Sequence, residues 1–431
     1  TFYKQVIDSK ITDAIQTATD EAKKDGGFYR TVQLGTDDEN AANLNRVWNT
    51  DQYISSIYSS SYNKAYQNFR KDTFGLEQPY RNFLMQSEES NPIYARFMGE
   101  KYIVTKSKMK GVRLLGKSGE WKIYENESAA SIIYGTSQVM SEKNYDKLDY
   151  PYNQTTLLQK AVVPESATKQ TDSIEAVDNL HNAVLRFGEN SCISEADGGY
   201  HIFARKDTKV KAEIVSQIDI NSVNTENAGE NTNVTNETKT DSGNRVLLLR
   251  FKVKNLKPSK DLTIWVDGDR NKLSAKQRVY YNDNTTFTYA VALEGDENQV
   301  EVTFSKGKYN LSDVEAYIAT LPGTELYESE FLQNSTKTKG NVIAGNLTMQ
   351  KSGYLITSIP YDSGFQIQVD GKNVKSEKVN TAFLGCKMKA GEHDIVITYH
   401  APGMAAGKVM SFVGMMGFLI LSVLEHVDTK K

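Results

Sequence analysis

The chain has 431 residues with a formal net charge of -3, and its mean hydropathy is -0.53. A balanced charge argues against the broad basic face that nucleic-acid binding requires, and two cysteines are too few for a disulfide-rich scaffold. The length exceeds what one hydrophobic core usually organises, so we expect more than one domain.

Residues 1–163 alternate between helix-like and strand-like patterns. Apolar residues recur at helical spacing up to Ala22, and Gly26–Gly27 then stops the pattern. A strand, "GFYRTVQL", is followed by a helix in "SSSYNKAYQNFRK", whose serines suit an N-cap, and by a short helix in "SNPIYARFMG" with Pro92 in its first turn. The remaining pieces are the strands "KYIVT", "GVRLL", "EWKIYEN" and "ASIIYGTS" and short helices near 141–148 and 154–160. This alternation predicts an α/β layer domain.

From residue 164 the pattern changes to short alternating strands separated by Gly, Asn and Asp. We expect a β-sandwich over 164–335, interrupted by a polar loop at 220–244, and a second β unit over 336–403. The strands expected in the first unit are "AVLRF", "GYHIFARK", "VKAEIV", "RVLLLRFKVKNL", "LTIWVDG", "TTFTYAVAL" and "NQVEVTF". The fold class is therefore α+β.

The two β units share a sequence pattern, which suggests an internal repeat. "LTIWVDGDRN … TTFTYAVALEGDENQVEVTF" is echoed by "FQIQVDGKNV … NTAFLGCKMKAGEHDIVITY", and "GGYHIFA" resembles "SGYLITS". Asp-Gly between strand-like segments predicts a hairpin turn. Asp267, Asp269 and Asn271 also alternate as in a calcium loop, but Lys272 and Arg278 stand where that loop needs glycine and a closing acid.

No other motif indicates catalysis or metal binding. The five histidines (His181, His201, His393, His400 and His426) lack ligand spacing, and nucleophile-elbow, phosphate-loop and dinucleotide patterns are absent from the sequence. We therefore assign no catalytic residue, metal or cofactor. Cys192 and Cys386 fit small core residues better than a disulfide, because their spacing says nothing about proximity.

Two features suit a polar or sugar ligand. "SSIYSSSYN" places hydroxyls before a helix N-terminus, and aromatic rings gather in the first β unit, where they can stack on sugars. The candidate ligand-binding residues are Tyr58, Ser59, Ser60, Tyr62, Asn63 and Trp265. The rings considered with Trp265 are Tyr280, Tyr281, Phe287 and Tyr289. Helix capping for the first group and strand packing for the rings are the structural alternatives, and they are favoured for each single residue.

The C-terminal segment "KVMSFVGMMGFLILSVLEHVDTKK" has no charge from Val409 to Leu424 and no polar face. Extended back to Ala405, it is long enough to span a bilayer, so residues 404–427 are predicted as a transmembrane helix. The terminal lysines favour a cytoplasmic C-terminus and place the rest of the chain outside the cytoplasm. A buried terminal helix is the alternative. The start at Thr1 carries no signal peptide, so we expect export to depend on a preceding segment.

Several segments resemble the bacterial membrane protein family YfhO. They include "GFYRTVQL", "SSIYSSSYNKAYQNF", "ARFMGEKYIVTK", "GEWKIYENESAASIIYGTSQVMSE" and the tail "SGYLITSIPYDSGFQIQVDGKNVKSEKVNTAFLGCKMKAGEHDIVITYHAPG". The resemblance implies a C-superfamily membrane glycosyltransferase that takes sugar from a polyprenyl-phosphate donor. It implies an envelope polymer such as teichoic or lipoteichoic acid in Gram-positive bacteria as acceptor. The family's catalytic acids lie between N-terminal membrane helices, so none is transferred here.

The sequence thus predicts that this chain is the extracytoplasmic region of such an enzyme. We expect this region to position the acceptor and to contact the lipid bilayer, and we expect no nucleic acid as a partner. A membrane-anchored, non-catalytic glycan- or wall-binding ectodomain is the alternative.

Overall fold

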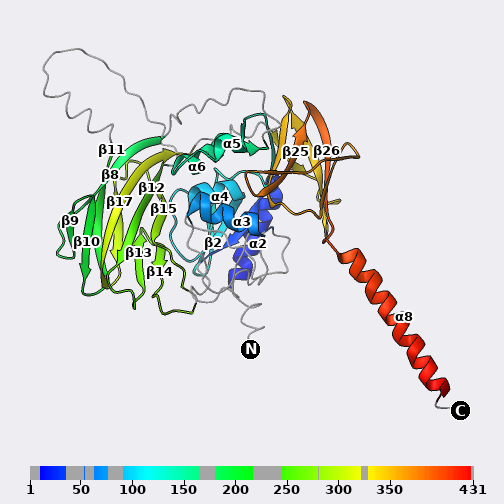
Figure 1. Ribbon diagram of the computed structural model, residues 1–431. Helices are drawn as coiled ribbons and strands as arrows, with labels where there is room; N and C mark the ends of the chain where they lie inside the picture. Colours follow the sequence, from blue (N-terminus) through cyan, green and yellow to red (C-terminus); the bar gives the residue numbers. More distant parts are fainter. Residues whose placement is uncertain are drawn as a thin grey trace.

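The computed structural model describes residues 10–34, 53, 63–75, 91–164, 180–216, 245–279, 281–321 and 329–428. An N-terminal α/β layer, two β-sandwiches and a long C-terminal helix follow one another, with short helices between the layers (Figure 1). This arrangement confirms the α+β class. The predicted loop at 220–244 lies outside the described residues.

The N-terminal layer consists of helix α2 (Lys10–Asp25) and a four-stranded sheet. The strand order is β1 (Arg30–Gln33), β2 (Glu100–Thr105), β4 (Trp121–Glu125) and β3 (Arg113–Ser118), with β1 and β2 parallel. Ala14, Ile15 and Ala18 form one face of α2 and pack on the sheet. Gly26 ends the helix at a φ of 74°, where a side chain would be strained.

Short helices fill the space between this layer and the sandwiches. They are α3 (Lys64–Asn68), the π-helical turn η2 (Phe69–Thr73), α4 (Pro92–Met98), α5 (Glu142–Tyr145), α6 (Tyr152–Thr155) and η3 (Thr156–Leu158), joined by the parallel strands β6 (Val139–Ser141) and β7 (Ala161–Val163). The expected Pro92 helix is confirmed as α4. The N-cap of α3 is Asn63 rather than a serine, because its side chain accepts a hydrogen bond from the Tyr66 amide at 3.0 Å.

The first sandwich is a ten-stranded sheet folded over one core. Its strands are β8 (Leu180–Phe187), β9 (Ile193–Ala196), β10 (Gly199–Ala204), β11 (Thr208–Ser216), β12 (Arg245–Asn255), β13 (Leu262–Val266), β14 (Asp269–Leu273), β15 (Thr286–Leu293), β16 (Gln299–Phe304) and β17 (Gly307–Thr320). Strand β17 pairs with β10 in its first half and with β8 in its second half, so it joins the two faces.

The second sandwich has two five-stranded sheets. One contains β18 (Ser329–Glu330), β5 (Ile133–Thr136), β21 (Gly353–Pro360), β25 (Phe383–Met388) and β24 (Glu377–Val379). The other contains β19 (Leu332–Gln333), β20 (Val342–Met349), β26 (Gly391–Tyr399), β22 (Phe365–Val369) and β23 (Lys372–Val374). Strand β5 belongs to the N-terminal part of the sequence, yet it pairs with β21 and β18.

The predicted repeat has a structural basis in the two Asp-Gly turns. Asp267 and Asp370 have φ values of 48° and 51°, followed by Gly268 at 94° and Gly371 at 72°. Positive φ at both central residues is the type I′ hairpin geometry that Asp-Gly favours. The pairing partners also correspond: β13 lies between β14 and β16 as β22 lies between β23 and β26. The counterpart of β21 is β12, which pairs with β15 as β21 pairs with β25; the proposed match of "GGYHIFA" (β10) with "SGYLITS" was wrong.

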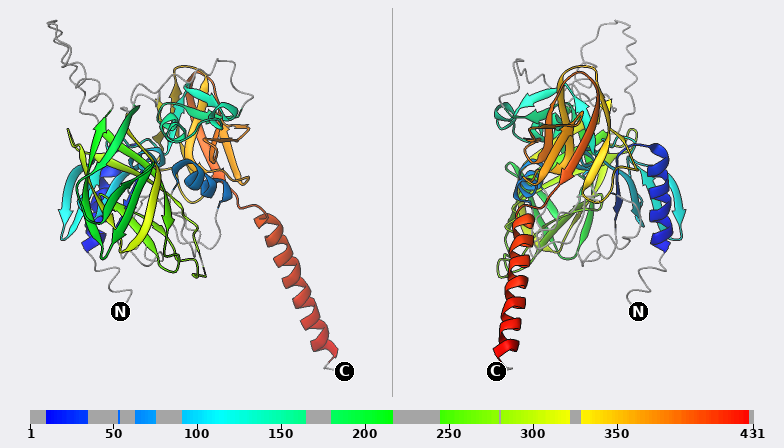
Figure 2. Two further views of the ribbon diagram at one scale, coloured as in Figure 1. Left: turned by 60° about the vertical axis from the view of Figure 1, so that its left-hand side comes forward. Right: turned by 90° about the vertical axis from the view of Figure 1, so that its right-hand side faces the viewer.

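Helix α8 (Met404–Asp428) projects from the second sandwich and packs on none of the other described elements (Figures 1 and 2). Residues Met404–His426 are long and apolar enough to cross a membrane, and none of the most apolar stretch is buried. A buried terminal helix would cover these side chains, so the structure favours the membrane interpretation over that alternative.

Both cysteines are free, buried thiols, and they lie in different cores. Cys192 packs inside the first sandwich and Cys386 inside the second. This rules out the disulfide alternative and confirms the assignment of both residues to hydrophobic cores.

Candidate binding cleft

Of the six candidate ligand-binding residues, the structure describes Asn63 and Trp265; Tyr58, Ser59, Ser60 and Tyr62 lie outside the described residues. Asn63 caps α3 and donates from its amide nitrogen to the Tyr361 carbonyl at 2.7 Å. Both ends of its side chain are therefore used within the protein.

Trp265 lies on β13, opposite Arg270 on β14 and Thr303 on β16. Its neighbours Ile264 and Val266 are fully buried, so alternation turns the Trp265 side chain to the outer face of the first sandwich, where it is half-buried. Asn63, by contrast, is held against the second sandwich. The two residues therefore do not form one site.

The other aromatic residues of the first β unit are mainly structural. Phe287 and Tyr289 lie in the core, and the Tyr289 hydroxyl donates to the Ile264 carbonyl at 2.9 Å. Tyr281 is partly buried against the same core, and Tyr280 lies outside the described residues. Packing in or against the core accounts for the three described rings, as the structural alternative expects.

Two residues of the calcium-like pattern, Asp267 and Asn271, bond to other groups of the protein. The Asp267 carboxylate accepts from the Glu301 amide at 2.7 Å and from Lys110 at 2.8 Å. Asn271 is buried and donates to the Thr288 carbonyl. These contacts hold a hairpin turn and tie it to the neighbouring strand and to the N-terminal layer, and they support the turn interpretation.

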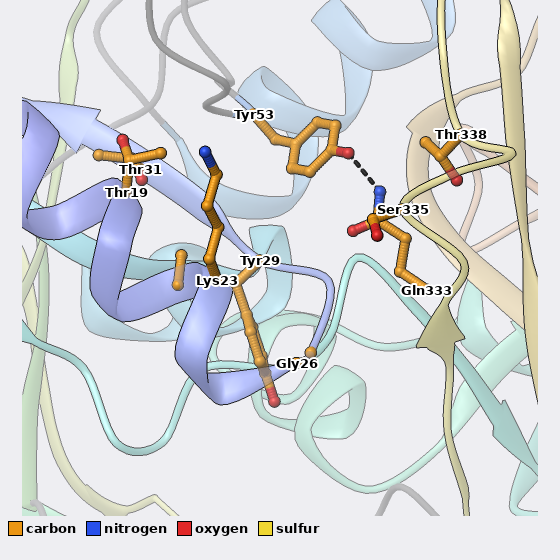
Figure 3. Close-up of a pocket in the computed structure, with 11 residues that line it drawn as sticks. Thr19, Lys23, Gly26, Tyr29, Thr31, Tyr53, Gln333, Ser335 and Thr338 are labelled. Carbon is orange, nitrogen blue, oxygen red and sulfur yellow. Dashed lines mark hydrogen bonds between the residues drawn. The ribbon is translucent and has the colours of Figure 1, made fainter.

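A polar cleft of about 530 Å³ opens between the N-terminal layer and the second sandwich. That volume is within the range typical of small-ligand sites. One wall is the end of α2 and the start of β1, and the other is the segment after β19 (Figure 3). The lining residues are Thr19, Ala22, Lys23, Gly26, Gly27, Tyr29, Thr31, Tyr53, Gln333, Ser335 and Thr338.

The chemistry of the cleft is that of hydroxyls, one amide and one ammonium. Tyr53 bridges the two walls, because its hydroxyl accepts a hydrogen bond from the Gln333 amide nitrogen (Figure 3). Its backbone carbonyl also accepts from the Thr31 amide at 2.8 Å. Among the described lining residues there is no carboxylate, and Lys23 contributes the charge. Such a surface suits a neutral or anionic polyhydroxylated ligand.

The floor of the cleft is fixed by contacts between the two walls. The Tyr29 hydroxyl donates to the Glu330 carboxylate at 2.5 Å, and the Lys101 ammonium lies 4.2 Å from the centre of the Tyr29 ring. Burial and the bond to Glu330 raise the pKa of Tyr29, so its hydroxyl stays protonated as a donor. Lys101 also pairs with Asp25 at 2.5 Å.

Gly27 allows this close approach. A Cβ there would lie 2.3 Å from the Tyr29 ring and 2.7 Å from the Glu330 carboxylate. Larger residues would separate the two walls of the cleft.

A buried arginine also holds the two walls together. Arg30 is 6% exposed and donates to the Met98 carbonyl, to the Ser358 hydroxyl at 2.5 Å and to the Ser358 carbonyl at 3.0 Å. Burial lowers the pKa of the guanidinium, and three acceptors compensate for its lost hydration. Met98 ends α4 and Ser358 lies on β21, so the contact joins the N-terminal layer to the second sandwich.

No direct signal in the sequence points to this cleft. Its two walls are about 300 residues apart along the chain, as the separation of 301 between Tyr29 and Glu330 shows. The Gly26–Gly27 pair was recognised as a helix stop, and it is the local feature that could have drawn attention to a close approach.

The family model "Bacterial membrane protein YfhO" matches residues 2–411. The chain belongs to the YfhO family. A curated relative, the uncharacterized protein YfhO of Bacillus subtilis (strain 168), is 22% identical over 375 residues, which are 84% of this chain and 40% of the relative. The chain thus spans less than half the length of that relative.

Two solved structures give weak structural matches. The mycobacterial arabinofuranosyltransferase AftD (mutant R1389S, class 2) aligns with 35% of this chain and 12% of its own at 12% identity and a TM-score of 0.16. The tandem CBM22 domains of Paenibacillus barcinonensis Xyn10C align with 51% of this chain and 85% of their own at 7% identity and a TM-score of 0.18. At these TM-scores neither likeness supports an inference about the YfhO chain.

Proposed function

We propose that this YfhO chain is the extracytoplasmic region of a multi-spanning membrane glycosyltransferase. The whole protein would transfer sugar from a polyprenyl-phosphate donor to an envelope polymer such as teichoic acid. This region would position the acceptor, while the catalytic residues would lie in parts of the protein outside this chain. Family membership and the candidate membrane helix α8 support the placement at a membrane.

The observation that carries the proposed role is the polar cleft. It offers hydroxyl, amide and ammonium groups at a junction that Arg30, Tyr29 and Tyr53 hold in place. A rigid, polar cleft without a lining carboxylate can bind a hydroxyl-rich, phosphate-bearing chain without charge repulsion. It can therefore hold such an acceptor in one orientation above the bilayer.

The test of this role uses the full-length protein in cells that lack it. Ser335→Trp would fill the cleft, because Ser335 is an exposed lining residue. Ser352→Trp is the matched control, since Ser352 is an exposed serine in the turn between β20 and β21 and does not line the cleft. We expect the sugar content of the envelope polymer to fall with the first variant and to match wild type with the second.

Three results would decide between the hypotheses. Unchanged envelope glycosylation after deletion of the full-length protein would reject the glycosyltransferase proposal. If deletion alters glycosylation but Ser335→Trp has normal activity, the glycosyltransferase proposal stands and only the role of the cleft in positioning the acceptor is rejected. Purified protein that binds envelope glycan although deletion leaves glycosylation intact would favour the anchored binding ectodomain.

The proposed orientation has its own test. External protease applied to intact cells should cleave the β-rich region and leave a tag after α8 protected, because that tag would lie in the cytoplasm. Cleavage of the tag, or protection of the β-rich region, would reverse the assignment.

A further inference from the structure

The loops at one end of the first sandwich form a basic surface. Strand pairing brings five connections to this end: β8–β9, β10–β11, β12–β13, β14–β15 and β16–β17. Their basic residues are Arg205, Lys206, Lys257, Lys260, Lys276, Arg278 and Lys306, against the acidic residues Glu189, Asp207, Asp261 and Asp283. We call this surface the basic end.

The opposite end of the same sandwich carries acidic residues, and we call it the acidic end. Its β15–β16 connection contains Glu294, Asp296 and Glu297, and its β13–β14 turn contains Asp267. Lys108 pairs with Glu294, and Lys110 pairs with Asp267 and Glu297, so much of this negative charge is neutralised within the protein. The excess of positive charge therefore lies at the basic end, and an uneven charge distribution of this kind orients a protein in the field of a charged surface.

The basic end is a fixed scaffold because its two longest loops are bonded to each other. The Lys276 amide donates to the Pro258 carbonyl at 2.8 Å, and the Gln277 side chain donates to the Ser259 carbonyl at 2.6 Å. Asp261 anchors the base of the same loops through Arg278, at 3.0 and 2.7 Å.

Three lysines project from this scaffold. Lys257, Lys260 and Lys276 are exposed and pair with no carboxylate among the described residues. Asp261, which lies in the same loops, is already neutralised by Arg278 and by Lys272 at 2.9 Å. The three ammonium groups are therefore free to meet an anionic surface.

An apolar side chain projects from the same loops. The side chain of Val279 is 89% exposed. This exposed fraction is larger than that of any large hydrophobic residue in the described part of α8. A solvent-exposed valine beside basic residues suits the boundary between lipid headgroups and acyl chains.

The basic end and α8 lie on the same side of the molecule. In Figure 1 the lower ends of β13 and β14 and the whole of α8 extend in the same general direction, away from the end where β11 finishes, and α8 also points downward in both views of Figure 2. With α8 in a bilayer, the basic end therefore faces the lipid surface.

From this placement we propose that the basic end docks on anionic phospholipid headgroups, with Val279 inserted at the interface. Lysines near a membrane surface are attracted by anionic lipids over about a Debye length. This contact would fix the height and tilt of the sandwiches over the bilayer. It depends on α8 as a membrane span and is independent of the proposed glycosyltransferase activity.

The experiment uses the full chain in lipid nanodiscs, and co-elution with the nanodisc reports the insertion of α8 separately. An environment-sensitive fluorophore is attached at Val279→Cys and, as a control, at Asp296→Cys on the acidic end; the native thiols are buried. Spin-labelled lipid then quenches a fluorophore that reaches the interface. The nanodiscs contain phosphatidylcholine alone or an equal mixture with phosphatidylglycerol.

We expect quenching at position 279 and none at 296, and stronger quenching at 279 with phosphatidylglycerol. Replacement of Lys257, Lys260 and Lys276 by glutamine should remove that dependence on anionic lipid. The same change at three exposed lysines of the second sandwich, Lys351, Lys387 and Lys389, is the charge-matched control and should preserve it.

Equal quenching at 279 and 296 would overturn the proposal. So would quenching at 279 that is the same in both lipids, because the anionic headgroups would then have no role. Loss of the lipid dependence in the control variant would also overturn it, since net charge rather than the basic end would be responsible.

Discussion

Asn63 offers the sharpest test of whether a predicted ligand residue is structural. Its side-chain oxygen accepts from the Tyr66 amide at 3.0 Å, and its nitrogen donates to the Tyr361 carbonyl at 2.7 Å. Loss of an N-cap costs about 1 kcal/mol, and loss of a hydrogen bond costs about 1 kcal/mol. Asn63→Ala should therefore weaken the contact between α3 and the Tyr361 segment by about 2 kcal/mol. At 1.4 kcal/mol per factor of ten, this raises the equilibrium constant for local opening roughly 30-fold.

Asn63→Asp separates the two contributions. The carboxylate still caps α3, but it cannot donate to the Tyr361 carbonyl. The Tyr66 amide reports the cap directly, and the Tyr361 amide, which donates to the Ala382 carbonyl, reports opening of the segment that Asn63 holds. Hydrogen exchange should therefore accelerate at both amides in the alanine variant, and at the Tyr361 amide alone in the aspartate variant. Unchanged exchange at Tyr66 in Asn63→Ala would refute the capping role. Loss of glycan binding with unchanged exchange would restore Asn63 as a ligand residue.

Three further predictions concern the backbone, pH and thiols. Gly99→Ala should lower the free energy of unfolding by more than the 1–2 kcal/mol expected for left-handed strain, because its Cβ would lie 2.8 Å from a carbonyl oxygen. Gly340→Ala, with a φ of 60° and open space around it, should show the strain alone in urea unfolding. The hydrogen bond from His393 lowers the pKa of Asp370, so its stabilisation is present above the ordinary value of 3.8 and lost as pH falls through the lower folded value. As the pH falls below 3.8, hydrogen exchange at the β22–β23 turn, corrected for intrinsic rates, should therefore rise in the wild-type protein. It should not rise in Asp370→Asn, which has no carboxylate to protonate. Burial raises the pKa of Cys386 to about 12, so maleimide should label it only after denaturation, and rapid labelling of native protein would contradict the buried position.

Local signals in the sequence predicted local structure. In "SNPIYARFMG" the N-cap Asn91, Pro92 in the first turn and Gly99 at a φ of 72° each act within one helix, and α4 begins and ends as they require. Both Asp-Gly turns were equally readable, because the sequence of a two-residue turn sets its backbone geometry. The apolar run of α8 was readable from its length and lack of a polar face.

Long-range pairing was not predictable in the same way. Ile133–Thr136 has an ordinary strand pattern, and its partners on β21 are about 220 residues further along the chain. The sequence of one strand does not identify the strand with which it pairs, so the insertion of β5 into the second sandwich could not be inferred. Arg30 was unremarkable in sequence for the same reason, since its acceptors come from α4 and β21.

The insertion of β5 gives the candidate cleft a mechanical connection to the membrane helix. One wall of the cleft is the segment after β19, which leads into β20. Strand β20 pairs with β26 along its whole length, and β26 continues into α8 after four residues. The opposite wall is joined to the same sandwich by Arg30 and by the pairing of β5 with β21. Because both walls are fixed to the sheets that carry α8, a ligand in the cleft would be held at a set distance from the bilayer, as an acceptor-positioning role requires.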